Sequence, residues 1–195
     1  MIFDWNNNKE EALANGIQDP SRSWGNYNVM KATNKVVKNH VFRNFEKLKF
    51  EEETLVVDCV FENCKTIDFD ECRIENCTFT RIDTIYATQS NFTNSKFKEL
   101  VCDNSMVISL EDSDISHCSF EDVELKDDSY LCDGVGTSWL EHCSFSNIRT
   151  SREDKEIIFC EETVGKIFKR KEKFCIIDKR TCTGLDDIIG PDIED

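Results

Sequence analysis

The sequence lacks the segments that would place the chain in or across a membrane. No run of about 18 apolar residues occurs, so no stretch has the length and hydropathy of a transmembrane helix. The chain begins Met-Ile-Phe-Asp-Trp-Asn-Asn-Asn and lacks the basic start followed by an apolar stretch that marks a secretory signal. The sequence therefore predicts a cytoplasmic protein with no membrane partner.

Positive charge is also scarce. The chain has 24 Lys and Arg residues against 39 Asp and Glu residues, which gives a formal net charge of −15. Nucleic acids and anionic membranes are bound through clustered basic residues, so direct binding of either is not expected. The acidity is consistent with plain solubility, with a basic partner, or with mimicry of a polyanion.

Cysteine is abundant, but the patterns that give it a chemical role are missing. The eleven cysteines are an odd number, so at least one thiol has no intramolecular partner, and no Cys-x-x-Cys pair occurs. A zinc module built on such a pair is therefore not predicted. The pattern favours a cysteine-rich core of buried, reduced thiols that act as small hydrophobic residues.

What the sequence does contain is an eleven-residue pattern that occurs five times between Thr54 and Ile148. The copies begin at Thr54, Cys72, Ser90, Ser113 and Ser138. Their starts are 18, 18, 23 and 25 residues apart. Position one is small, position three is apolar, position six is Cys or Ser, position eight is always Phe, and position eleven is apolar or Cys. These five positions are expected to face the core.

A period near 20 residues predicts a solenoid, in which each coil buries its apolar face only against neighbouring coils. Short alternating segments rich in β-branched and aromatic residues predict strands rather than helices. Parallel strands stack about 4.7–4.9 Å apart, which places equivalent residues above one another. The residues at position eight are therefore expected to form one internal column: Phe61, Phe79, Phe97, Phe120 and Phe145.

Three parts of the chain are predicted. Residues 1–39 form an N-terminal cap with a short helix that begins after Asn8 and stops at Gly16. Residues 40–160 form the β-helix, with residues 40–53 as a degenerate first coil. Residues 161–195 supply capping strands and an acidic tail from Asp186. The basic segment Lys166 to Phe174 is expected to protect a sheet edge.

The two longer intervals between copies predict insertions at one corner of the coil, from Val101 to Asp112 and from Glu124 to Thr137. Insertions in repeat proteins map to one face, and that face is often the binding face. The apolar pair Tyr130 and Leu131 within the second insertion is expected to tuck against the fold. The insertions are therefore candidates for a binding surface.

Three units of the repeat resemble pentapeptide repeats, which consist of a small residue, any residue or Asp/Asn, a central Leu or Phe, and two further residues. The units are Cys72-Arg-Ile-Glu-Asn with Cys77-Thr-Phe-Thr-Arg, Ser90-Asn-Phe-Thr-Asn with Ser95-Lys-Phe-Lys-Glu, and Ser113-Asp-Ile-Ser-His with Cys118-Ser-Phe-Glu-Asp. The resemblance covers residues 54–148 and implies a right-handed, quadrilateral parallel β-helix whose small and central residues face inward.

The sequence departs from the pentapeptide pattern in several respects. Only two pentads per coil are clear, the Asp or Asn before the central residue is present at Asn91 and Asp114 but seldom elsewhere, and the coil lengths differ from the regular 20 residues of the family. A square and a triangular cross-section both stay open. A weaker similarity, to the β-helix of tubulin-folding cofactor C and cyclase-associated proteins, lacks their Asp-Cys-x-x-Cys rhythm. The expected fold is an all-β solenoid, a right-handed parallel β-helix of about five to six coils with a short helical N-terminal cap and an irregular C-terminal cap.

No catalytic, cofactor-binding or metal-binding residue is predicted. His117 and His142 share the fifth position of successive copies and could bind a metal with Glu141, but a surface ladder is the better interpretation because further ligands are lacking. Gly134-Val-Gly136 lacks the third glycine of a nucleotide loop. Carboxylates that could serve a sugar-active β-helix occur without a defined cleft, at Asp112, Asp114, Asp122, Asp127 and Asp128.

The predicted function is that of a non-catalytic, acidic interaction module or scaffold that presents a flat β-helical face to a protein partner. Some pentapeptide-repeat proteins mimic duplex DNA and inhibit DNA gyrase, so the resemblance implies a DNA-mimic inhibitor as one alternative. A carbohydrate-active β-helix is a second alternative. The sequence leaves the identity of the partner and the oligomeric state open.

Overall fold

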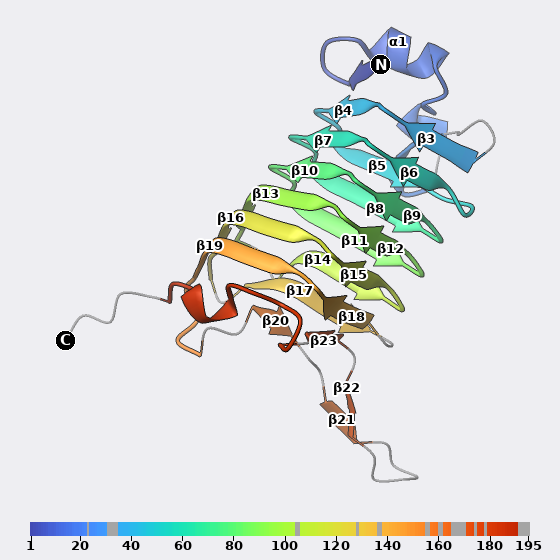
Figure 1. Ribbon diagram of the computed structural model, residues 1–195. Coiled ribbons are helices and arrows are strands. Elements are labelled where there is room, and N and C mark those ends of the chain that lie inside the picture. Colours follow the sequence, from blue (N-terminus) through green and yellow to red (C-terminus); the bar gives the residue numbers. More distant parts are fainter. Residues whose placement is uncertain are drawn as a thin grey trace.

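The computed structural model describes residues 1–22, 24–30, 35–103, 106–127, 129–135, 138–154, 157–159, 162–164, 171–173, 175–177 and 179–190. Three seven-stranded sheets, in which all strand pairs are parallel, wrap round one axis (Figure 1). The predicted all-β solenoid is confirmed, and it has three faces.

Each sheet takes one strand from every turn of the chain. Sheet 1 contains β1 (Ile2–Asp4), β4 (Val41–Arg43), β7 (Val60–Glu62), β10 (Thr78–Thr80), β13 (Lys96–Cys102), β16 (Ser119–Leu125) and β19 (Ser144–Thr150). Sheet 2 contains β2 (Asn28–Val29), β5 (Lys47–Phe50), β8 (Thr66–Asp70), β11 (Thr84–Thr88), β14 (Met106–Glu111), β17 (Tyr130–Val135) and β20 (Ile158–Phe159). Sheet 3 contains β3 (Val36–Lys38), β6 (Leu55–Val57), β9 (Arg73–Glu75), β12 (Asn91–Thr93), β15 (Asp114–Ser116), β18 (Ser138–Glu141) and β23 (Cys175–Ile177).

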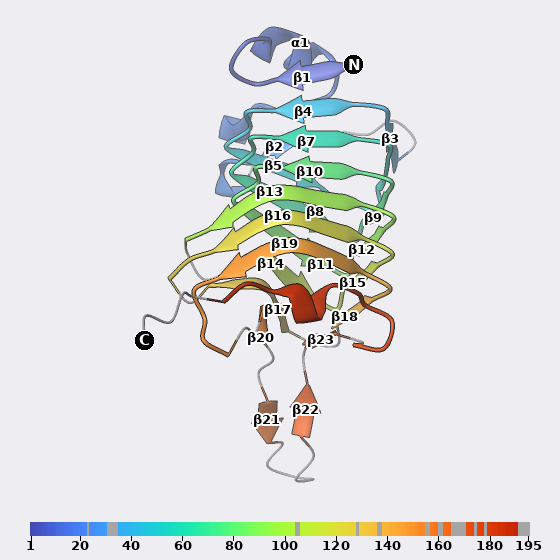
Figure 2. The ribbon, with the colours of Figure 1, turned by 60° about the vertical axis from the view of Figure 1, so that its left-hand side comes forward.

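The chain passes through sheets 2, 3 and 1 in turn, and five complete turns run from β5 to β19. In Figure 2 the strands of sheet 1 run from right to left as the chain descends, which is the sense of a right-handed coil. Parallel connections are right-handed in nearly all proteins because right-handed strand twist favours that crossover. The predicted first coil is present, since β4 pairs with β7 and β5 pairs with β8.

The inward positions of the repeat agree with the prediction. Every residue at positions one, three, six, eight and eleven of the five copies is buried, with at most 4% of its surface exposed. The Phe column is present and extends two residues beyond the predicted five, to Phe42 and Phe3. Neighbouring rings have centroids 4.8–5.2 Å apart and planes within 28° of parallel, which is offset stacking.

The corners of the coil depend on residues in the left-handed backbone region. Among the described residues, twenty other than glycine have positive φ, although the chain has only seven glycines. The corner between sheets 3 and 1 uses position five of the repeat, with φ of 51–55° at Asp58, Asn76, Asn94, His117 and His142. Position ten also has positive φ, of 51–56°. Asn63 and Arg81 lie at the corners after β7 and β10, whereas Glu99, Asp122 and Asn147 lie at bends within β13, β16 and β19. A positive φ turns the chain sharply, so strands of three residues can follow one another.

The predicted insertions are mostly strand rather than loop. Strands β13, β16 and β19 are seven residues long, whereas β10 has three, and their added residues stay paired as Leu100, Val123 and Ile148. Each insertion also contains a strand of sheet 2, which is β14 in the first insertion and β17 in the second. Leu131 is buried, and the guanidinium of Arg152 lies 4.3 Å from the ring centre of Tyr130, so this pair packs against the fold. The insertions therefore widen the coil.

The N-terminal cap closes one end of the coil with a strand and a helix. Strand β1 pairs with β4, and α1 (Lys9–Ala14) lies beyond it (Figure 1). Asn8 occupies the N-cap position but makes no side-chain capping hydrogen bond. Asp4 accepts hydrogen bonds from the side chains of Asn44 and Asn7, both at 2.9 Å, and these bonds lower the pKa of its carboxyl group. Short 3₁₀ helices follow at Pro20–Arg22 and Trp24–Asn26.

The C-terminal cap runs along the last strand of sheet 1. The N–H of Phe145 donates to Thr183 and the N–H of Ile189 donates to Ile148, both at 2.9 Å, on either side of the 3₁₀ helix Leu185–Asp187. Gly184 has φ of 81°, and a Cβ atom there would lie 1.9 Å from the carbonyl oxygen of Phe145. Residues 186–190 of the predicted acidic tail thus belong to the cap, while residues 191–195 lie outside the described residues.

A two-stranded antiparallel sheet of β21 (Glu162–Val164) and β22 (Lys171–Lys173) projects past this end (Figure 2). Of the basic segment from Lys166 to Phe174, only the three residues of β22 are described. The prediction that this segment protects a sheet edge therefore falls largely outside the described residues.

Replacing Phe97 by Ala is expected to lower the free energy of unfolding by about 3–5 kcal/mol, because the ring is fully buried and its removal leaves a cavity. The ring stacks between Phe79 and Phe120, with centroids 4.9 and 4.8 Å away. Urea denaturation measures the loss. The control Lys96→Ala, at an exposed position of the same strand, is expected to change stability by less than about 0.5 kcal/mol. A loss below about 1 kcal/mol for Phe97→Ala would contradict burial of the column.

Candidate functional site

The residues considered as candidate catalytic or metal-binding groups do not form one site. Asp112 lies at the corner between sheets 2 and 3, Asp114 lies on sheet 3, and Asp122 lies at the bend within β16. Asp127 lies in the turn after β16, and Asp128 is outside the described residues. The structure thus separates the carboxylates that follow one another in the sequence.

His117 and His142 stack on one another at the corner between sheets 3 and 1. Their ring centroids are 4.7 Å apart, with an angle of 23° between the planes. Within the part of the chain that the structure describes, no group of three or more His, Cys, Asp and Glu residues could hold a metal ion. The pair belongs to the column of exposed polar side chains that continues through Asn94 and Asn76.

Nine cysteines among the described residues lie inside the coil, buried and free of disulfide bonds: Cys59, Cys64, Cys72, Cys77, Cys102, Cys118, Cys132, Cys143 and Cys182. Burial raises the pKa of the thiols of Cys64, Cys72, Cys118 and Cys143 to about 12. The thiolate is the nucleophilic form, so these side chains are inert at neutral pH.

The outer face of sheet 1 is covered by charges that pair between coils. Arg43 contacts Glu62 at 2.5 Å, and Lys98 contacts Glu121 at 2.8 Å. At the adjoining corner, the guanidinium group of Arg81 forms an ion pair with the carboxylate of Glu99. Exposed pairs of this kind contribute little to stability, and they leave this face a solvated surface with balanced charge.

The outer face of sheet 2 contains a cluster of charged side chains that is partly buried. The strand register aligns one outward residue from each of five coils in a central column: Lys49, Asp68, Tyr86, Ser109 and Asp133. Lys49 lies among three carboxylates, with Nζ 3.2 Å from Asp70, 3.7 Å from Asp68 and 3.8 Å from Glu51. The exposed fractions of the Lys49 and Asp68 side chains are only 22% and 19%. This ion-pair cluster is therefore half-buried on a face that is otherwise open.

Burial works against charge in this cluster. It raises the pKa of Asp68, and Lys49 partly offsets that shift. Burial also disfavours the charged form of Lys49, but the neighbouring carboxylates outweigh it and raise its pKa. The ammonium group of Lys49 therefore lies beside the carboxyl group of Asp68, with the carboxyl groups of Asp70 and Glu51 also within 4 Å of it.

Tyr27 from the N-terminal segment contributes to the same face. The Nζ atom of Lys47 lies 5.4 Å from the centre of its ring and donates a hydrogen bond of 3.2 Å to the carbonyl of Gly25. Burial raises the pKa of Tyr27, and the charge of Asp68 raises it further. Tyr86, one coil beyond Asp68, has 44% of its surface exposed. The face therefore presents tyrosine side chains beside a charged cluster.

Asp133 lies at the other end of the column. Burial raises the pKa of its carboxyl group, and a hydrogen bond to Ser109 opposes that shift. Its Oδ1 atom is buried without a hydrogen-bond partner among the described residues. Asp133 belongs to β17 and Ser109 belongs to β14, and both strands lie within the predicted insertions. The insertions therefore contribute residues to this face of sheet 2.

The sequence analysis missed Lys49, Asp68, Tyr86 and Asp133 as functional candidates. The inward residues of two of these strands are Ile67 and Phe69 in one coil and Ile85 and Ala87 in the next. The residue between each pair points outward, which is the signal that could have found Asp68 and Tyr86. Because these outward residues differ from coil to coil, repetition alone did not identify them.

None of the helices in the described part of the chain is long and apolar enough to cross a membrane. Comparison of the chain with protein-family models, with curated proteins and with solved structures gives no match.

Proposed function

We propose that the chain is a non-catalytic protein-binding module and that the outer face of sheet 2 binds a basic, extended segment of a partner protein. The observation that carries this proposal is the half-buried cluster around Lys49 and Asp68, with Tyr27 and Tyr86 beside it. Tyrosine is enriched at binding hot spots, where it combines a large apolar ring with a hydroxyl group.

The charge on this face favours a basic partner. It has two lysines, Lys47 and Lys49, and five carboxylates, so its formal charge is two minus five, or −3. The carboxylates are Glu51, Asp68, Asp70, Glu111 and Asp133. A Lys or Arg side chain of the partner could pair with a carboxylate and lie over a tyrosine ring, which typically contributes about 0.5–1 kcal/mol at an exposed site.

Three further expectations support a binding role and are part of the proposal. The buried thiols and the scattered aspartates favour a protein without catalysis. Free thiols fit a reducing, cytoplasmic location. The inward small and central residues fit a divergent pentapeptide repeat, although the three sheets differ from the four faces typical of that family.

The proposal is tested with two variants of sheet 2 and two matched controls. Tyr86→Ala and Glu111→Lys change exposed residues of sheet 2, while Val101→Ala and Glu124→Lys make comparable changes at exposed residues of sheet 1. Proteins captured from extract of the source cells by each bait are quantified by mass spectrometry at low and at physiological salt. The captured partner is then purified, and its affinity is measured for each variant.

Each sheet 2 variant is expected to weaken binding by at least about 2 kcal/mol, or roughly 30-fold, as loss of a hot spot does. The controls are expected to bind as the unaltered protein does, and added salt should weaken the interaction because charges contribute to it. A partner that tolerates both sheet 2 variants, or that cross-links to sheet 1 instead, would refute the proposal.

A DNA-mimic inhibitor is the second candidate, and one acidic ridge favours it. Carboxylates crowd the corner between sheets 2 and 3, at Glu51, Glu52, Glu53, Asp70, Glu71, Glu111 and Asp112. Carboxylates on successive coils are spaced by about 4.7–4.9 Å along the axis of the solenoid, whereas the phosphates of one DNA strand are spaced by about 3.4 Å along the helix axis. If the ridge mimics DNA, micromolar protein should inhibit supercoiling of relaxed plasmid by gyrase. Full supercoiling at that concentration would exclude this candidate for gyrase.

A further inference from the structure

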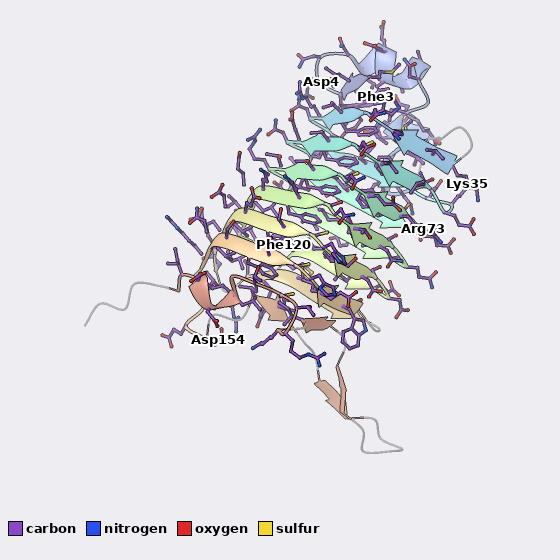
Figure 3. All side chains as sticks on the ribbon, viewed as in Figure 1. Phe3, Asp4, Lys35, Arg73, Phe120 and Asp154 are labelled. Carbon is purple, nitrogen blue, oxygen red and sulfur yellow. The ribbon has the colours of Figure 1, made fainter. Side chains whose placement is uncertain are left out.

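The lower half of the outer face of sheet 3 differs from the charged faces of sheets 1 and 2. The register places one outward residue of each coil in a column, in the order Leu55, Arg73, Asn91, Asp114 and Trp139. Arg73 points outward from this sheet, whereas Phe120 lies inside the coil (Figure 3). From Asn91 to Trp139 the column contains no cation. The surface of Trp139 is 41% exposed, and this residue pairs in register with Ile176 of β23.

Hydrogen bonds to the main chain hold two side chains of this column along the sheet. The N–H of Asp114 donates to Oδ1 of Asn91, and the N–H of Trp139 donates to Oδ1 of Asp114, each at 3.1 Å. Within the described residues, Nδ2 of Asn91 and Oδ2 of Asp114 have no protein partner. The column thus presents an amide donor, a carboxylate acceptor and an indole ring in a fixed order.

The flanking column of the sheet is mostly uncharged and polar. It has Thr93 and Ser116 beside Asn91 and Asp114, followed by Glu141 beside Trp139. Asn94 and the stacked pair of His117 and His142 line the adjoining corner. The face therefore has many hydrogen-bonding groups, one aromatic ring and little apolar area.

These groups match one class of ligand better than others. A protein interface needs an apolar, water-excluding centre, and from Asn91 to Trp139 only Trp139 supplies an apolar side chain to the two described columns. A nucleic acid needs basic residues, and the nearest one in the column is Arg73, one coil beyond Asn91. A sugar ring has an apolar C–H face and a rim of hydroxyl groups that both donate and accept hydrogen bonds.

We propose that the column Asn91, Asp114 and Trp139 on sheet 3 is a binding site for a neutral oligosaccharide. The indole ring of Trp139 stacks on the C–H face of one sugar ring, while Nδ2 of Asn91 and Oδ2 of Asp114 bind hydroxyl groups of the next. Strand spacing makes the distance from Asn91 to Trp139 about 10 Å, which exceeds one pyranose ring. The site binds the sugar without cleaving it and is separate from sheet 2.

The purified full chain is first applied to an array of neutral and sulfated glycans. The neutral oligosaccharide with the strongest signal is then titrated by calorimetry into the unaltered protein and its variants. Binding of a neutral glycan is expected. Trp139→Ala should weaken the affinity at least tenfold, and Trp139→Phe, which retains an aromatic ring, should weaken it less.

Two more variants separate a binding role from a structural one. Ser116→Arg introduces a large side chain beside the column without altering Trp139, and it should also weaken binding at least tenfold. Tyr86→Ala on sheet 2 should bind the glycan as the unaltered protein does, and thermal unfolding confirms that each variant is folded. The proposal is overturned by an array without neutral ligands, by binding restricted to sulfated glycans, or by full affinity in both Trp139→Ala and Ser116→Arg.

Discussion

Every turn of this chain depends on the hydrogen bonds at its corners. At each corner a residue with left-handed backbone conformation turns the chain from one sheet into the next. Its N–H donates a hydrogen bond to the next coil, as from Asp58 to the carbonyl of Glu75 at 3.1 Å. The small residue that follows directs its N–H inward. The side-chain oxygen or sulfur atom of the equivalent residue in the next coil accepts a hydrogen bond from this N–H. Cys72 donates in this way to Oγ of Ser90 at 2.8 Å, and Cys77 to Oγ of Ser95 at 3.1 Å. The hydroxyl and thiol groups thereby satisfy buried N–H groups that would otherwise cost about 1–3 kcal/mol each.

The inward and outward residues of the coil therefore have different roles. The inward positions are occupied by stacked Phe rings and by the hydroxyl and thiol ladders, and burial raises the pKa of the thiols of Cys64, Cys72, Cys118 and Cys143 to about 12. Binding is therefore left to the outward residues, which are free to vary from coil to coil. Sheet 1 balances its charges, sheet 2 has a half-buried ion-pair cluster with tyrosines, and sheet 3 has Trp139 among polar and acidic residues, including Asp114 and Glu141.

The period of the repeat predicted the solenoid, the inward positions and the Phe column, because those features recur in each coil. The number of faces could not be predicted, since inward spacing shows which residues face the core but not how many corners the coil has. The insertions were predicted at one corner of the coil, although alternation at Leu100 and Cys102, and at Val123 and Leu125, could have indicated longer strands there. Lys49, Asp68 and Tyr86 come from different coils without a shared pattern, so only the register brings them together.

The corner at Asn76 gives the most direct test of this account, because its φ is 55° and its side chain is exposed. Urea denaturation of Asn76→Gly and Asn76→Val compares a residue that adopts positive φ freely with a β-branched one that does not. The Gly variant should stay within about 1 kcal/mol of the unaltered protein, whereas the Val variant should be less stable than the Gly variant by at least about 1–2 kcal/mol. Equal stability of the two variants would contradict the claim that left-handed corners determine the fold.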